Sequence, residues 1–390
     1  MLCLFHGTAD QLFRILLSGF YQERQEIVTT IPATATPLAT EKSKYTGPII
    51  DTDIHETFTT MDELIPYLEE PWRGLIARKA WNGVGSPLAY WASAGVNRVD
   101  SQLANGEPAG SNYELLQQQV LDLYPIRYGV LTSQFYPGTM PGQFEFASAL
   151  ASAYNDWVLE HWVERDPRLL TSIHVAPQDP QAAAREIDRL GDHPRVVQVL
   201  LPIGKLPYGD PFYHPIFEAA QRHNLVIAMH HTQAVESALG RGRYYIEWHV
   251  NVPQGAMSML TSLVCNGVFD KFPSLQFAII ESGLSWLPHL LWRFDQNYKS
   301  LHQEIPWVKQ LPSKYIRERV KFSTQPTEDF SAENWLRLID MLETDRMFVF
   351  ATDYPHWDFD SPDESIPRSL PQDLKQRIFY ENARELYGLD

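Results

Sequence analysis

From about residue 48 onward, short apolar runs alternate along the chain with amphipathic stretches. The runs are rich in Val, Ile, Leu and Phe, a composition typical of strands that are buried on both faces. They predict eight strands: Ile49–His55, Tyr128–Ser133, Leu169–Val175, Val196–Leu201, Leu225–His231, Gln276–Ser282, Val320–Thr324 and Met347–Asp353.

Most of the stretches between these strands carry apolar residues at three- and four-residue spacing, which predicts helices that cover a sheet. Two of them follow suitable N-caps, at Asp179-Pro180 and at Ser331. The predicted helices are Phe144–Asp166, Gln181–Gly191, Pro215–Asn224, Ala332–Leu342 and Gln372–Tyr387. Strands that alternate with helices in this number favour an α/β fold, a closed (β/α)₈ TIM barrel, over an open sheet.

The domain organisation follows from where this alternation begins. Residues 1–45 are expected to form an N-terminal extension that is poorly ordered, with a Thr-, Ala- and Pro-rich linker, and residues 46–390 a single barrel domain. Residues 56–125 form a long insertion after the first strand. Its aromatic residues predict a segment that is partly helical and partly a lid: Trp72, Trp81, Tyr90 and Trp91.

Composition and charge limit the classes of binding partner that the chain can have. The net charge is −16, so phosphate-rich nucleic acid is an unfavourable partner. Two cysteines, Cys3 and Cys265, form neither a disulfide framework nor a thiolate metal site, which favours a reducing cytoplasm. No uninterrupted apolar stretch approaches membrane-spanning length. A small molecule is therefore the expected partner, and a homodimer is compatible with the sequence.

Candidate chemistry lies at the ends of the strands. In the first strand, alternation places Asp51, Asp53 and His55 on one face and the apolar residues on the other. The apolar face packs on helices, so the polar face points into the barrel. Buried charges there need either a metal ion or a salt-bridged cluster, and a metal ion is favoured because similar residues end other strands.

The fifth strand ends in His230-His231, and the eighth leads into Thr352-Asp353-Tyr354-Pro355-His356. Adjacent strand residues face opposite ways, so at most one of the two histidines should point inward. A lone histidine at a strand end is more often a packing residue, and an Asp before a turn is often a cap. Together, however, these residues supply two histidines and two carboxylates around one opening of the barrel.

An ordered series of segments from about Pro48 to the C-terminus resembles the amidohydrolase-related family, which includes 2-amino-3-carboxymuconate-6-semialdehyde decarboxylase and γ-resorcylate decarboxylase. The segments are Asp51–His55, Gly209–Tyr213, His230, Gly267–Pro273, Glu281–Gly283, Ser285–Pro288, Arg293–Asp295, Thr352–His356 and Glu381–Ala383.

This resemblance implies that Asp53, His55, His230 and Asp353 bind one divalent metal ion. Zn²⁺ is the expected ion, although the oxygen-rich ligand set also suits Mn²⁺ or Fe²⁺. Many relatives carry His where this chain has Glu281. Glu281 or Asp353 is therefore the expected catalytic acid–base, and Glu281 could instead be a structural carboxylate or an additional ligand.

For substrate binding the resemblance points to Arg293, with Trp286 and His249 as further candidates. Each has a structural alternative: an ion pair of Arg293 with Asp295 or Glu281, and packing for Trp286 and His249. The implied activity is metal-dependent decarboxylation of a small carboxylated substrate, by a carbon–carbon lyase. The alternatives are a metal-dependent hydrolase of a lactone or amide, and a barrel that has lost catalysis.

Overall fold

The computed structural model describes residues 45–81, 97–140, 142–204, 206–232, 240, 242–328 and 330–390. The chain divides into two units, 1–41 and 42–390, and all the described residues belong to the second. The predicted extension at residues 1–45 lies outside the described residues except for Tyr45, whose ring stacks on Phe379 at 4.5 Å between centroids.

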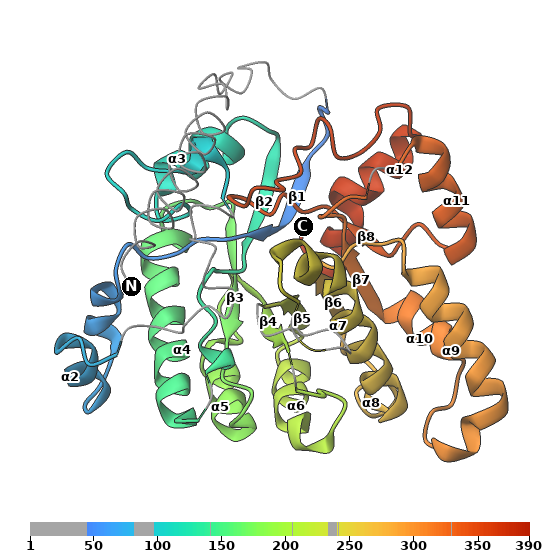
Figure 1. Cartoon of the computed structure of the whole chain (residues 1–390), viewed down its shortest axis with the longest axis horizontal. Coiled ribbons are helices and arrows are strands. Elements are labelled where there is room, and N and C mark those ends of the chain that lie inside the picture. Colours follow the sequence, from blue (N-terminus) through green and yellow to red (C-terminus); the bar gives the residue numbers. More distant parts are fainter. Residues whose placement is uncertain are drawn as a thin grey trace, which may run out of the picture. The chain divides into compact units, whose positions relative to one another are not determined.

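Eight parallel strands follow one another around a single sheet in sequence order (Figure 1). They are β1 Ile49–Ile54, β2 Ile126–Leu131, β3 Leu169–His174, β4 Val196–Ile203, β5 Val226–His231, β6 Phe277–Ile280, β7 Val320–Ser323 and β8 Phe348–Val349. Backbone hydrogen bonds from Thr52 N to Phe350 O (3.0 Å) and from His55 N to Tyr354 O (2.7 Å) join the segment of β8 to β1. The strands thus form a nearly closed barrel, and the predicted TIM-barrel fold is confirmed.

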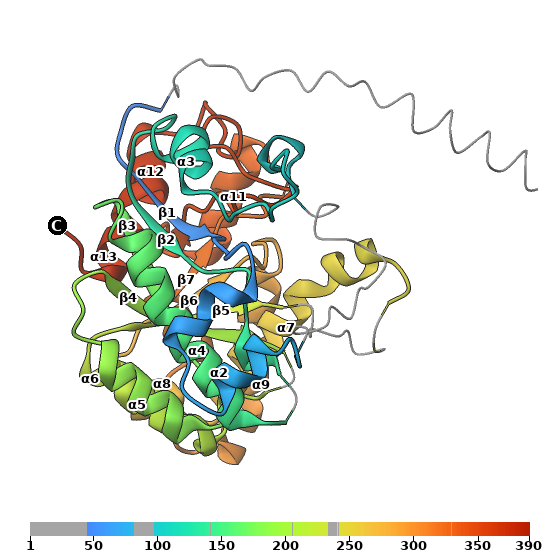
Figure 2. The same cartoon turned by 90° about the vertical axis from the view of Figure 1, so that its left-hand side faces the viewer.

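The helices lie outside the strands in both views (Figures 1 and 2). The α-helices are α2 Trp72–Ala77, α3 Tyr113–Leu116, α4 Phe144–Val158, α5 Pro180–Leu190, α6 His214–Arg222, α7 Tyr245–Cys265, α8 Val268–Lys271, α9 Leu287–Leu301, α10 Pro312–Arg319, α11 Ala332–Leu342, α12 Gln372–Gln376 and α13 Asn382–Tyr387. The predicted caps are present, because the side chains of Asp179 and Ser331 accept hydrogen bonds from Ala182 N and Asn334 N. The bounds of the long helices α7 and α9 were not predicted.

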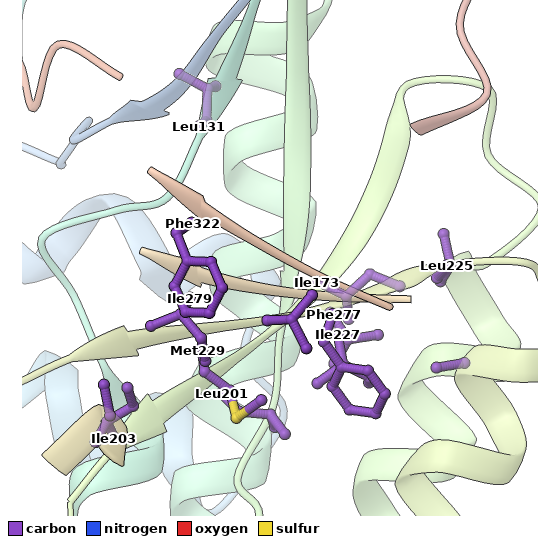
Figure 3. Close-up of a cluster of buried hydrophobic side chains, with 14 of the residues drawn as sticks. Leu131, Ile173, Leu201, Ile203, Leu225, Ile227, Met229, Phe277, Ile279 and Phe322 are labelled. Atoms are coloured by element: carbon purple, nitrogen blue, oxygen red, sulfur yellow. The ribbon is translucent and has the colours of Figure 1, made fainter. Parts of the chain in front are cut away.

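Alternate strand residues enter two different cores, as a period of two requires. Ile227, Met229, Phe277 and Ile279 belong to the large cluster between strands and helices, part of which Figure 3 shows. Val226, Ala228, Ala278 and Ile280 belong instead to a cluster inside the barrel. His230 continues the inner series Val226–Ala228, which places it inside the barrel at the carboxyl end of β5.

The C-terminal residues close the other end of the barrel. Leu386 is a member of the inner cluster, and the Tyr387 hydroxyl donates a 2.8 Å hydrogen bond to Gln198 Oε1 on β4. Asn382 is fully buried and donates from Nδ2 to the Phe348 carbonyl at 2.8 Å. The closing Glu381–Ala383 segment therefore has a structural role, because it anchors the last helix to β8.

The described parts of the insertion between β1 and β2 contain a 3₁₀ helix at Met61–Tyr67 and helices α2 and α3, joined by turns and irregular segments. Trp72 and Trp81 pack on Phe146 of α4, with ring centroids 5.0 and 5.2 Å away. Tyr90 and Trp91 of the predicted lid lie outside the described residues. Among the residues described, no helix is long and apolar enough to cross a bilayer.

Candidate metal centre

The carboxyl end of β1 brings Asp53 and His55 into the barrel. Both side chains are almost completely buried. The Nδ1 atom of His55 lies 2.6 Å from the Ser133 carbonyl oxygen. A carbonyl can only accept a hydrogen bond, so Nδ1 carries the proton and Nε2 of the neutral ring keeps a lone pair. That Nε2 faces Asp53 Oδ1 at 3.3 Å and Asp353 Oδ1 at 3.0 Å.

His230 is oriented in the same way. Its Nδ1 lies 2.5 Å from the backbone oxygen of His231, so its Nε2 is the free position in the neutral ring. This Nε2 is 3.6 Å from Asp53 Oδ2 and 2.9 Å from Glu281 Oε2. In metal proteins, a hydrogen bond of one ring nitrogen to a carbonyl is the common way to present the other nitrogen to the ion.

Glu281 and Asp353 both have left-handed backbone conformations, with φ of 52° and 59°. Such conformations are costly for residues other than glycine and cluster at functional sites. Glu281 follows β6, where its amide donates to Ser323 Oγ at 2.8 Å. Asp353 follows β8, and the predicted strand Met347–Asp353 ends early, at Val349, because the chain turns before Asp353. These turns direct the two carboxylates toward the histidines.

Ligand atoms of Asp53, His55, His230 and Glu281 all lie within 4.8 Å of one another, and so do those of His55, Glu281, Asp353 and His356. Four buried atoms in this group have no hydrogen-bond partner among the described residues: Asp53 Oδ2, His55 Nε2, His230 Nε2 and Glu281 Oε2. Buried polar atoms are normally satisfied, so the donor set fits a divalent cation. We call these six residues, Asp53, His55, His230, Glu281, Asp353 and His356, the central cluster.

The charges in the central cluster shift the ionisation of its members. Burial alone would lower the pKa of His230, but Asp53 and Glu281 outweigh it and raise the pKa to about 10. Asp53 and Asp353 likewise raise the pKa of His55 well above its ordinary value, against the effect of burial. The same carboxylates that favour imidazolium would favour a metal cation in its place, so metal and protons compete for this site.

The pKa values of Asp353 and Glu281 shift in opposite directions. Burial and the neighbouring Glu281 carboxylate raise the pKa of Asp353 well above its ordinary value. Burial would raise the pKa of Glu281 too, but His231 and His230 hold it well below its usual range. The cluster therefore holds one carboxyl that favours the proton and one that favours the charge, a separation typical of acid–base sites.

Asp51 shares the strand face of Asp53, as predicted, but lies deeper in the barrel. Its carboxylate accepts hydrogen bonds from Thr352 N at 2.9 Å and from Thr352 Oγ1 at 2.5 Å. Burial raises its pKa to about 7 despite these bonds. Asp51 thus ties β1 to the segment after β8 and fixes the residue that precedes Asp353.

The three predicted substrate-binding residues lie in different surroundings. Arg293 lies on α9 with an exposed side chain, outside the buried central cluster. Its two suggested ion-pair partners are engaged elsewhere: Asp295 accepts from Ser313, and Glu281 faces His230 and His231.

Trp286 belongs to the large hydrophobic core, and its indole N–H donates to the Ser282 carbonyl at 2.7 Å. Packing is thus the role that these contacts show for Trp286, and its place at the substrate stays a prediction. His249, near the start of α7, lies beside the cluster, since donor atoms of His249, Glu281 and Asp358 all lie within 4.8 Å of one another.

Several residues near the cluster were not assigned a role from the sequence. His231 was expected to face away, yet its Nε2 lies 2.7 Å from Glu281 Oε1, because the left-handed turn at Glu281 directs that carboxylate across the end of β5. His356 Nδ1 lies 2.6 Å from Asp353 Oδ1, and the Tyr136 ring stacks on His230 at 5.7 Å. The run Asp353–Asp358, in which three of six residues are Asp or His, was the available signal for His356 and Asp358.

A family model described as Amidohydrolase matches residues 50–389. The γ-resorcylate decarboxylase of Rhizobium sp. (strain MTP-10005) is 26% identical over 267 residues, which cover 63% of this chain and 77% of that protein. The 2-amino-3-carboxymuconate-6-semialdehyde decarboxylase of Dictyostelium discoideum is 23% identical over 290 residues, covering 70% of this chain and 73% of that protein.

Among solved structures, the fold is similar to that of 5-carboxyvanillate decarboxylase from Novosphingobium aromaticivorans, with a TM-score of 0.64 and 20% identity. The match covers 90% of this chain and 100% of the other. That protein was crystallised with manganese and 4-hydroxy-3-methoxy-5-nitrobenzoic acid.

Proposed function

The chain belongs to the amidohydrolase family, and on that premise we propose that it is a metal-dependent carboxy-lyase that removes CO₂ from a small aromatic or unsaturated carboxylic acid. One observation carries the proposal. The Nε2 atoms of His55 and His230, each fixed by a hydrogen bond from Nδ1 to a backbone carbonyl, converge with buried carboxylates that have unpartnered oxygens.

We infer that Asp53, His55, His230 and Asp353 hold one divalent ion. When bound, the ion would supply a positive charge that holds and polarises a carboxylate or an adjacent oxygen of the substrate. Two imidazoles with several carboxylates suit Zn²⁺, the ion expected from the sequence, but the oxygen-rich set suits Mn²⁺ equally well. The manganese in the related decarboxylase supports Mn²⁺.

We infer that Asp353 and Glu281 provide the general acid–base catalysis of the decarboxylation. When CO₂ leaves, the pair of electrons of the broken carbon–carbon bond stays on the substrate carbon, which then takes up one proton. Burial and Glu281 favour the protonated form of Asp353 while the site is empty, whereas a bound cation would favour its charged form, so Asp353 would accept and pass on that proton rather than store it. Its Oδ1 lies 2.6 Å from His356 Nδ1, a hydrogen bond that fixes the orientation of the carboxylate.

Glu281 complements Asp353 as the charged member of the pair. It contacts His230 and His231, at 2.9 and 2.7 Å, and its negative charge raises the pKa of Asp353. A hydrolase of a lactone or amide could use the same residues as a base toward water. The named relatives are decarboxylases, which favours CO₂ release over hydrolysis. A barrel without catalysis is disfavoured because burying the three carboxylates of the central cluster is costly and serves no structural purpose.

The test combines metal analysis with a substrate screen. Purified protein should hold a tightly bound divalent ion, and His55→Ala or His230→Ala should lose most of it, whereas His289→Ala, a control at an exposed histidine of α9, should keep it. The metal-loaded enzyme should release CO₂ from at least one aromatic carboxylate. Ring opening of lactones without CO₂ release would favour the hydrolase, and equal metal content in all variants would overturn the proposal.

A further inference from the structure

Beside the central cluster, His249 and Asp358 form with Glu281 a second group of ligand atoms, and the proposed reaction uses neither His249 nor Asp358. His249 comes from the N-terminal part of α7, and Asp358 from the loop after β8. His249 Nε2 is 3.4 Å from Asp358 Oδ2, and the donor atoms of His249, Asp358 and Glu281 all lie within 4.8 Å of one another. One imidazole and two carboxylates from three separate elements thus meet at one point.

The surroundings hold these side chains in place. The His249 ring is stacked on Tyr245 at 5.7 Å and also contacts Trp357 at 5.6 Å. Gln325 donates from Nε2 to the Asp358 carbonyl at 3.2 Å and to Asp353 Oδ2 at 3.1 Å, so one amide links both groups of ligands. Ligands that are fixed before the ion arrives lose little freedom on binding.

Two features indicate that this group lacks a partner. Asp358 Oδ2 is buried and accepts no hydrogen bond from the described residues. Glu281, whose side chain is 6% exposed, has its Oε2 at 2.9 Å from His230 Nε2 without a satisfied hydrogen bond. Buried carboxylate oxygens in this state are costly unless a cation or a donor reaches them.

Charge balance points to a cation. Asp53, Glu281, Asp353 and Asp358 bring four negative charges into adjoining groups. With neutral imidazoles, a single divalent ion leaves two of these charges unbalanced, and a second divalent ion removes the difference. Glu281 belongs to both groups and has two carboxylate oxygens, which allows it to serve both ions.

We propose that His249, Asp358 and Glu281 form a second divalent-metal site, joined to the first through Glu281. The inference rests on the first site proposed above, because the two share a ligand. The oxygen-rich set of one imidazole and two carboxylates suits Mn²⁺ or Mg²⁺. Three protein ligands leave coordination positions for water or for a polar group of the substrate, so the second ion binds more weakly than the first and helps to hold the substrate.

The experiment measures how many manganese ions each chain binds. The full-length protein is dialysed to equilibrium against increasing Mn²⁺, and bound manganese is measured by elemental analysis together with the electron paramagnetic resonance spectrum. The wild type should saturate at two ions per chain with an exchange-coupled signal. Asp358→Asn and His249→Gln should saturate at one ion and show an uncoupled signal. Asp360→Asn is the matched control, because Asp360 accepts from Thr327 N outside both groups, and it should bind two.

The remaining outcomes distinguish failure of the second site from failure of the proposed function. One ion per chain in the wild type, lost on His55→Ala but kept on Asp358→Asn, overturns the second site and leaves the proposed function standing. No bound ion at any concentration overturns both. Two ions with unchanged affinity in Asp358→Asn and His249→Gln also overturns the assignment. Melting curves of both variants establish that they are folded, and either one alone suffices for the test.

Discussion

His230 Nε2 and His231 Nε2 contact the two oxygens of the same carboxylate, Oε2 and Oε1 of Glu281, at 2.9 and 2.7 Å. Neighbouring residues of a strand normally face opposite ways. Here one carboxylate spans both faces at the end of β5, because Glu281 lies in a left-handed turn just beyond β6. Glu281 therefore connects the inner ligand His230 with a histidine that the strand pattern alone assigns to the outer face.

Replacing Glu281 with Gln should lower kcat by about 10²–10⁴-fold, the usual contribution of general acid–base assistance. Gln keeps the shape but loses the charge that acts on Asp353 and the histidines. The tightly bound ion should remain, because Asp53, His55, His230 and Asp353 are intact. Turnover and metal content are measured side by side, with Glu333→Gln on the exposed face of α11 as the control. Unchanged turnover in Glu281→Gln would move the acid–base role to Asp353 alone.

His231→Ala should keep the tightly bound ion and yet reduce kcat. Loss of a hydrogen-bonding partner from a charged, buried group costs about 1.5–3 kcal/mol, which corresponds to about 10- to 100-fold in rate. His230→Ala should instead lose the ion. Elemental analysis and steady-state kinetics on the two variants distinguish a partner of Glu281 from a metal ligand. Loss of the ion in His231→Ala, with retention in His230→Ala, would exchange the two assignments.

Gly209→Ala should destabilise the fold without a direct effect on the metal centre. A Cβ at residue 209 would collide with the backbone oxygen and carbon of Ser262 on α7. Overpacking of this kind costs about 1–3 kcal/mol, which chemical denaturation can measure. Gly142→Ala is a useful comparison, because a Cβ there meets no atom within 4 Å although its φ of 69° is unfavourable for alanine. Equal stability of Gly209→Ala and the wild type would mean that α7 can move away.

Acid should destabilise the protein partly through Asp166. Burial would raise the pKa of Asp166, but hydrogen bonds from Arg168 and Tyr113 hold it below its ordinary value. A depressed folded-state pKa gives stability that is present above about pH 4 and is lost as the pH falls through the folded-state value.

Asp166→Asn should therefore flatten the dependence of unfolding free energy on pH below about 4. Denaturant titrations at several pH values measure this slope. Asp122→Asn, which removes a half-exposed partner of the same Arg168, should have little effect on it. Equal slopes in Asp166→Asn and the wild type would show that Asp166 titrates alike in both states.

The sequence by itself determined the barrel and the inward face of its first strand. Alternating apolar runs and amphipathic stretches are local patterns, and a period of two places Asp53 with His55 whatever the rest of the chain does. The same pattern allowed only one of His230 and His231 to face inward, the family resemblance pointed to His230, and in the structure His230 continues the inner series of Val226 and Ala228.

Only the tertiary structure decided how residues from different strand ends meet. The approach of His231 to Glu281, the pairing of Asp51 with Thr352 and the position of Asp358 beside His249 depend on turns whose backbone angles the sequence pattern does not specify. It also showed where Trp286 lies, with its indole N–H bonded to the Ser282 carbonyl. Periodicity fixes which face a residue is on, whereas side-chain contacts between strand ends depend on the register and closure of the whole barrel.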